Sequence, residues 1–280
     1  MQTALIGLGL IGGSLGLALK GKRWGPITGY APHPETRQKA LAMGVVDRTA
    51  ESPQEAVRGA GLVVLATPIS ALPQVMAQVS PALEAGAVVT DTASTKAWVL
   101  EQARAFLPPN ASFIGGHPMA GKEAWGIEAA SVDLFRGAPY VITAAPGARG
   151  VDTVKAMAEA VGARPLFIEA GDHDRLVAGI SHLPLFLAAA LTLATARHPE
   201  WPLLSSLAAS GYRDTTRLAS GSPRMGRDIC FTNKAWLLFW LDQFLAQVQG
   251  LREDLEKDTL EVSLAQARQA REAWLQGRQR

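Results

Sequence analysis

The sequence contains a single cysteine, Cys230, among its 280 residues. One thiol cannot form an internal disulfide, and it excludes a metal site built from several cysteines. Cysteine use of this kind is typical of proteins in a reducing compartment, so we expect a cytoplasmic protein.

Charge of one sign is not in excess either. The 27 Lys and Arg residues against 25 Asp and Glu residues give a net charge of +2, spread over both halves of the chain. A nucleic-acid or membrane-binding protein usually carries a basic stripe or a polybasic patch, and none is visible here. Small, anionic molecules are therefore the expected partners.

A secretory leader and a membrane span are not expected. Only Met1, Gln2 and Thr3 precede the first apolar run, whereas a signal peptide needs a positively charged segment there. The longest uncharged apolar run elsewhere, Leu183–Ala196, is shorter than the roughly 20 residues that a spanning helix needs. We expect a soluble protein in which this run is a core helix.

Up to about residue 170 the sequence alternates between short β-rich runs and helical stretches such as Pro34–Met43, Lys96–Phe106 and Val151–Val161. Continuous apolar runs such as "LVVLA" are typical of parallel strands covered by helices on both faces. The pattern predicts a doubly wound α/β domain. Its expected strands are Ala4–Leu8, Ile27–Ala31, Leu62–Ala66, Val88–Thr92, Ser112–Gly115, Tyr140–Thr143 and Pro165–Glu169.

Beyond Gly171 strand-like runs give way to long helical patterns. We therefore predict two domains, residues 1–170 and residues 171–280, the second all-helical. Pro184 predicts a kink in the first long helix, because proline lacks a backbone N–H. The later stretch "WLLFWLDQFL" is more apolar than one buried stripe requires, which indicates either a helix centre or a subunit interface.

The first strand leads into the glycine pattern G-x-G-x-x-G, formed by Gly7, Gly9 and Gly12. In a strand–turn–helix unit these glycines allow the tight turn, the approach of a pyrophosphate and close helix packing, and the helix N-terminus attracts phosphate. A dinucleotide is the expected ligand of residues 1–170. The residues assigned to it in the loops after the expected strands are Gly7, Gly9, Leu10, Ile11, Gly12, Ala31, His33, Arg37, Thr67 and Pro68.

The end of the second strand favours NADP over NAD. NAD-binding domains usually carry an acid there to bind the ribose 2′-OH, and this chain has Ala31. His33, Thr36 and Arg37 follow and could surround a 2′-phosphate. Glu35 could instead take the part of the missing acid, so NAD stays possible.

Two later loops carry groups suited to chemistry. Ser94 and His117 each follow an expected strand of the sheet, at the edge where ligands of doubly wound domains bind. A neutral histidine can take a hydroxyl proton while hydride leaves the same carbon, and the serine could share that hydroxyl. His117 lies in a loop that follows two glycines, and "MAGKEAWG" behind it could close over a ligand.

Five blocks in register give the chain a family resemblance. "GLGLIGGSLG", "DTASTK", "GGHPMAGKE", "DHD" followed by "SHLP", and "GYRDTTRLASG" resemble the prephenate and arogenate dehydrogenases of tyrosine biosynthesis, in the same order over residues 5–221. The resemblance implies a nucleotide-binding domain, a helical dimerisation domain that forms a homodimer, and an oxidative decarboxylation.

The resemblance also implies site residues. His117 matches the family's catalytic histidine and Ser94 the serine beside it. Arg217 matches the arginine that anchors the ring carboxylate, His182 the first histidine of the Ser-His-Leu-Pro-His motif, and Glu123 a loop acid near the substrate side chain.

One departure from the family pattern concerns the substrate. Relatives that use prephenate often carry a second histidine where this chain has Leu185. Prephenate and arogenate differ only in the side chain, which is a keto acid in one and an amino acid in the other. Together with Ala31, the change resembles the NADP-dependent arogenate dehydrogenases.

Several alternatives stay open. Arg213 lies four residues before Arg217 and rivals it as the anchor if the segment is helical. Other possible activities are prephenate dehydrogenase, a β-hydroxyacid dehydrogenase using Lys234, and a redox sensor that binds dinucleotide without catalysis. Asp172 and Asp174 are expected to cap their own helix and not to bind metal. Lys96 and Lys122 are expected to face solvent.

Overall fold

The computed structural model describes residues 1–122 and 124–278. These residues divide into two compact units between Lys234 and Ala235, which are described separately. The domain boundary expected after residue 170 divides the first unit by type of secondary structure, and it stays a prediction.

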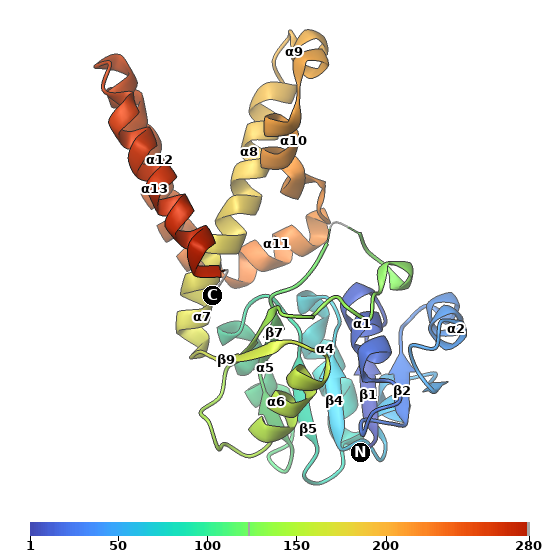
Figure 1. The fold of residues 1–280 in the computed structure, drawn as a ribbon. Helices are drawn as coiled ribbons and strands as arrows, with labels where there is room; N and C mark the ends of the chain where they lie inside the picture. The colour runs from blue at the N-terminus through green and yellow to red at the C-terminus, as the bar shows by residue number, and fades with distance from the viewer. Residues whose placement is uncertain (123, 279–280) are drawn as a thin grey trace. The chain divides into compact units, whose positions relative to one another are not determined.

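Six strands of the first unit form the parallel sheet that the apolar runs predicted (Figure 1). Their order is β3-β2-β1-β4-β5-β6, so the direction of strand addition reverses between β1 and β4, which is where doubly wound domains bind their ligands. The strands are β1 (Thr3–Ile6), β2 (Ile27–Tyr30), β3 (Arg48–Thr49), β4 (Leu62–Leu65), β5 (Val88–Asp91) and β6 (Ser112–Ile114).

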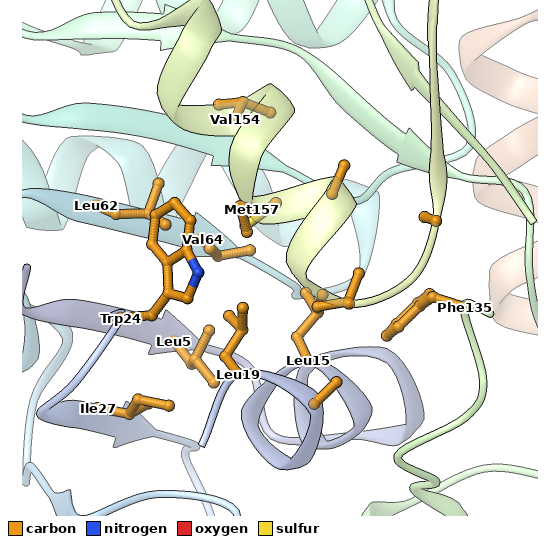
Figure 2. Packing of buried hydrophobic residues seen from close by; sticks show 14 of the residues in the cluster. Leu5, Leu15, Leu19, Trp24, Ile27, Leu62, Val64, Phe135, Val154 and Met157 are labelled. Carbon is orange, nitrogen blue, oxygen red and sulfur yellow. The ribbon is translucent and has the colours of Figure 1, made fainter. Parts of the chain in front are cut away.

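Helices cover both faces of this sheet, which explains the continuous apolar runs. On β1, Leu5 packs into one hydrophobic cluster while Ala4 and Ile6 pack into the other. Figure 2 shows the first cluster, where Leu5 and Trp24 lie among side chains of α1 and α6. The helices of this part are α1 (Leu10–Leu19), α2 (Pro34–Ala42), α3 (Pro53–Val57), α4 (Leu72–Val79), α5 (Ala97–Phe106) and α6 (Val151–Ala160), with short 3₁₀ turns η1 (Ile69–Ala71), η2 (Ser80–Ala82) and η3 (Ile127–Ala129).

A second, three-stranded sheet corrects the expectation that all strands belong to one sheet. It consists of β7 (Gly116–Pro118), β8 (Pro139–Ile142) and β9 (Arg164–Phe167) in the order β7-β8-β9. His117 was expected in a loop, but it lies in β7, antiparallel to β8 and opposite Val141. Glycine and proline are poor strand formers, so this strand depends on its partner and gives no local signal.

The rest of the first unit is helical, as predicted. One continuous helix is built from α7 (Ala170–Val177), the π-helical turn η4 (Ala178–His182) and α8 (Leu183–Ala196). It is followed by α9 (Trp201–Leu207), α10 (Ser210–Thr216), the 3₁₀ turn η5 (Arg217–Ser220) and α11 (Pro223–Thr232). The second unit contains most of α12 (Lys234–Glu256) and all of α13 (Leu260–Arg278).

The kink expected at Pro184 stays a prediction, and the structure places the π-helical turn η4 just before this residue. Proline has no N–H to bond the carbonyl four residues earlier, so the regular bonding pattern is interrupted at this point. Widened turns of this kind recur at functional sites, and here the turn contains His182.

The apolar helix differs from its expected role as a core helix. In α8 only Leu183 and Ala188 are buried within the single chain. Because α8 continues α7, the whole helix Ala170–Ala196 has 27 residues, and its most apolar stretch has a mean hydropathy of 1.9 and is 28% buried. By length and composition alone it could cross a membrane, a criterion that packed helices of soluble proteins also meet.

Candidate active site

The glycine loop lies between β1 and α1, at the carboxyl edge of the large sheet. Gly7 has a φ of +104°, and a Cβ there would lie 2.3 Å from the carbonyl oxygen of Ala66. A Cβ on Gly12 would lie 1.9 Å from the carbonyl oxygen of Gly7. By contrast, a Cβ on Gly9 would meet nothing within 4 Å. Two glycines thus close the turn, and the third borders open space.

This open space fits the phosphates of a dinucleotide. Helix α1 begins at Leu10 without a side-chain cap and without an acid in its first turn, so Leu10 and Ile11 have amide groups without helical partners. Across the switch point, Thr67 follows β4, and its hydroxyl oxygen is buried with no hydrogen-bond partner in the described part of the chain. Pro68 beside it is exposed. These residues would hold the pyrophosphate and the groups next to it.

Arg37 lies in α2, and its guanidinium reaches the end of β2, where the sequence predicted a phosphate-binding group. Its guanidinium is nearly buried: it donates to the carbonyl oxygen of Ala31 at 2.8 Å and forms an ion pair with Glu51. His33 and Glu35 are exposed at the start of α2. The end of β2 therefore has the Arg37 guanidinium where NAD-binding domains usually have an acid, and this guanidinium is already paired with the Glu51 carboxylate.

A buried ion pair at the end of β5 is hydrogen-bonded to the first residue of β7. Lys96, expected in solvent, is fully buried because its ammonium binds the Asp91 carboxylate and donates to the carbonyl oxygen of Gly116 at 2.6 Å. Asp91 also accepts from the backbone N–H of Gly116 at 3.1 Å. This pair fixes the residue before His117. Burial lowers the pKa of Lys96, and the charge of Asp91 opposes that effect.

His117 belongs to a chain of three polar side chains. Its Nδ1 lies 2.9 Å from Nε2 of His173, and Nδ1 of His173 lies 2.8 Å from Oδ1 of Asp174. The two imidazoles meet edge to face, with centroids 5.1 Å apart. Nε2 of His117 has no hydrogen-bond partner among the described residues. Unlike Nε2 of His182, it is not fully buried. One nitrogen is therefore held while the other is open to a ligand.

His182 lies in the same buried group. Asn233, at the end of α11, donates from Nδ2 to the carbonyl oxygen of Asp174 at 2.7 Å and lies 3.2 Å from Nδ1 of His182. Nε2 of His182 is buried and has no partner among the described residues. This side chain, like His117, keeps one ring nitrogen available.

The surroundings keep both histidines neutral. Burial, followed by the neighbouring His173, Lys96 and His182, holds the pKa of His117 well below its ordinary value. Burial lowers the pKa of His182 to about 4, although the Asp174 charge opposes the shift. A neutral imidazole is the form that can accept a proton.

The acids around His173 have other roles than expected. Glu169, and not Asp172 or Asp174, caps α7, and exposed Asp172 pairs with Arg175. The Asp174 carboxylate instead accepts from the backbone N–H groups of Lys96 and Ala97, at 2.7 and 2.9 Å, at the start of α5. Sequence reasoning thus named capping correctly but assigned it to the wrong helix.

The other predicted residues are less closely joined to this group. Ser94 is half-buried in the loop between β5 and α5. Arg213 is exposed beside Asp214, and Arg217 is exposed at the start of η5, which packs on α8. Glu123 lies outside the described residues. Reasoning from sequence missed His173 and Asn233; the "DHD" block that contains His173 was the available signal.

Comparison with family models identifies both parts of the chain. Residues 15–166 match the nucleotide-binding domain of prephenate dehydrogenase, and residues 169–269 match its dimerization domain. The chain belongs to the prephenate/arogenate dehydrogenase family. Within this family it is 37% identical to a prephenate dehydrogenase of Bacillus subtilis, over 92% of this chain and 71% of the relative. It is 34% identical to a cyclohexadienyl dehydrogenase of Zymomonas mobilis, over 90% and 87%.

Solved structures agree with this assignment. The Synechocystis arogenate dehydrogenase is 33% identical with a TM-score of 0.80, covering 98% of this chain and 100% of that one. The Aquifex aeolicus prephenate dehydrogenase, in complex with hydroxyphenyl propionate and NAD⁺, is 27% identical with a TM-score of 0.90, covering 98% of each. A 3-hydroxyisobutyrate dehydrogenase of Mycobacterium tuberculosis, at 14% identity and a TM-score of 0.54, shares only the fold. The protein is therefore a dehydrogenase of the prephenate/arogenate family with a nucleotide-binding domain.

Proposed function

We propose that this dehydrogenase converts L-arogenate to L-tyrosine by oxidative decarboxylation, with NADP as the hydride acceptor. The observation that carries the chemistry is His117: a buried, neutral imidazole at the carboxyl edge of the sheet, with Nδ1 held and Nε2 open. When bound, the nicotinamide accepts the hydride that leaves C4 of the ring.

Each side chain has a part in this proposal. Nε2 of His117 takes the proton of the C4 hydroxyl, and Ser94 hydrogen-bonds the same oxygen. Arg217 binds the ring carboxylate, for which a guanidinium offers two parallel donors. Loss of that carboxylate as CO₂ makes the ring aromatic. Nε2 of His182, which has no partner among residues 1–122 and 124–278, would donate to the substrate side chain.

The choice of arogenate depends on Leu185, three residues after His182. Leu185 packs against α11, where its Cδ2 would lie 3.4 Å from a Cβ on Gly226. An apolar side chain here offers no hydrogen bond to a keto group. Prephenate is the second candidate, because the Bacillus subtilis relative is a prephenate dehydrogenase.

Initial rates with two substrates and two cofactors test these choices. The reaction is monitored by the absorbance of the reduced nicotinamide. We expect kcat/KM to be highest with L-arogenate and NADP. Leu185→His should shift the preference toward prephenate, with Leu187→His, two residues further along α8, as the matched control. Turnover of neither substrate would reject the proposal, and cofactor binding without product, unchanged in His117→Asn, would favour the redox sensor.

The choice of NADP depends on Arg37, whose guanidinium is available to a 2′-phosphate only in competition with Glu51. Glu51→Gln removes the competing carboxylate, so the KM for NADP should fall several-fold while the KM for NAD stays constant. Glu35→Gln is the comparison: a rise in the KM for NAD in that variant alone would mean that Glu35 binds the ribose and that NAD is the natural cofactor.

We also propose that the protein forms a homodimer through its helical region, as the matched dimerization domain suggests. Large apolar side chains are exposed on several of its helices, for example Phe186, Leu207 and Phe231. Light scattering over a concentration series should give twice the mass of 29.7 kDa. A monomer at micromolar concentration would contradict this part of the proposal.

A further inference from the structure

We infer that one hydrogen-bonded network centred on Asp174 holds His117 and His182 in opposite tautomers, so that His117 presents a bare Nε2 and His182 presents an Nε2–H. His173 and Asn233 are the positioning residues of this network. Its catalytic meaning rests on the proposed function, whereas the tautomers themselves do not.

The first branch starts at the Asp174 carboxylate, which can only accept hydrogen bonds. Because Nδ1 of His173 lies 2.8 Å from Oδ1, that nitrogen carries the proton. The carboxylate is already stabilised by the N–H groups of Lys96 and Ala97 at the start of α5, so it does not require an imidazolium beside it. His173 is then neutral, and its Nε2 is an acceptor.

The consequence reaches His117. Its Nδ1 lies 2.9 Å from this acceptor and must therefore carry the proton of the ring. The proton of a neutral imidazole is on one nitrogen only, so Nε2 of His117 is left with a free lone pair. This is the tautomer that a general base needs.

The second branch starts at the carbonyl oxygen of Asp174. A carbonyl accepts only, so the atom of Asn233 that faces it at 2.7 Å is the amide nitrogen Nδ2. The same nitrogen lies 3.2 Å from Nδ1 of His182, which therefore accepts. The proton of His182 must lie on Nε2, the buried atom without a described partner. That N–H is a donor suited to a carboxylate or carbonyl oxygen of a ligand.

The tautomers can be observed directly in the full-length protein. The chain has five histidines, so ¹⁵N-histidine labelling with long-range ¹H–¹⁵N NMR at pH 8, assigned by single substitutions, resolves each ring. We expect protonated Nδ1 in His117 and protonated Nε2 in His182. The opposite tautomer at either residue, or a His173 protonated on both nitrogens, would overturn the inference, whether or not the protein turns over arogenate.

Two substitutions of His173 separate tautomer control from packing. In His173→Gln the amide can still accept from His117 and donate to Asp174, so kcat should stay within about tenfold of the original. In His173→Phe the edge-to-face contact is kept but both nitrogens are lost, and kcat should fall by about 10²- to 10⁴-fold, the scale of a misplaced general base. A packing role predicts the reverse order. Exposed His198→Gln is the control.

Asn233→Leu tests the second branch, because leucine has the same branched arrangement of non-hydrogen atoms and no donor. The NMR spectrum should lose the fixed Nε2–H tautomer of His182. Since a donor to the substrate side chain is weakened, KM should rise roughly tenfold while kcat changes little. An unchanged KM with a lower kcat in a variant that unfolds at the original temperature would contradict the assignment.

Discussion

The buried pair of Lys96 and Asp91 gives the sharpest prediction about stability. Both side chains are fully enclosed, and the ammonium also donates to the Gly116 carbonyl. Lys96→Met fills a similar volume but leaves the carboxylate without its counterion. Breaking one side of a buried ion pair costs about 3–5 kcal/mol.

Asp91 keeps two backbone hydrogen bonds in Lys96→Met, so we expect the loss of unfolding free energy to lie near the lower end of that range. In Lys96→Met, Asp91 would still accept from the backbone N–H of Ala93 at 2.9 Å and of Gly116 at 3.1 Å. Hydrogen bonds to a charged group contribute about 1.5–3 kcal/mol each, so they stabilise the lone carboxylate in part. We therefore expect the free energy of unfolding to fall by about 3 kcal/mol at pH 7.

A double-mutant cycle supplies the control. Asp91→Asn with Lys96→Met removes both charges, and a neutral pair of similar volume is often as stable as a buried ion pair. Urea unfolding followed by circular dichroism should show at least half of the lost stability restored in the double variant. A single variant within about 0.5 kcal/mol of the original, or a double variant as unstable as the single one, would refute the reasoning.

The remaining predictions concern pH and the glycine loop. Because burial lowers the pKa of His182 from 6.5 to about 4, its neutral ring contributes stability that is complete above pH 6.5 and is lost as pH falls toward 4. Over that interval unfolding measurements should show a loss that is about 3 kcal/mol larger in the original protein than in His182→Gln. Gly9→Ala should leave stability unchanged, since its Cβ meets nothing within 4 Å, but equilibrium dialysis should show NADP binding weakened by about tenfold. Gly12→Ala should instead lower the unfolding free energy by about 1–3 kcal/mol or more, because its Cβ would lie 1.9 Å from a backbone oxygen.

The main sheet could be predicted because each strand carries its own signal. β1, β4 and β5 are apolar runs covered on both faces, and the glycine loop follows the first of them. β3 and β7 could not be predicted in this way. The first has two residues, and the second combines Gly116, His117 and Pro118, so both exist only through pairing with distant strands.

The candidate site divides along the same line. His117 and Ser94 could be named because both follow expected strands and so belong to the ligand-binding edge. The polar group that holds His117 could not be found from spacing. His173 and Asp174 are adjacent in sequence, but the hydrogen bonds that join this pair to His117 and Asn233 connect residues that are far apart. His117 and His173 are 56 residues apart, and Asp174 and Asn233 are 59 residues apart. The burial of Lys96 has the same origin, since its second acceptor, Gly116, lies on another strand.

The buried polar network around Asp174 is better explained by its orienting of His117 and His182 than by a contribution to stability. Apolar side chains of similar volume would fill the space at no greater cost in free energy, because burying charge removes its hydration. The Asp174 carboxylate accepts hydrogen bonds from the backbone N–H groups at the start of α5 and from His173. Its backbone carbonyl oxygen accepts one from Asn233. Substituting Asp174 would therefore remove the contacts of its carboxylate with α5 and with His173 together, and could not separate folding from catalysis. His173 and Asn233 each disturb one branch, so they are the positions at which the two roles can be measured apart.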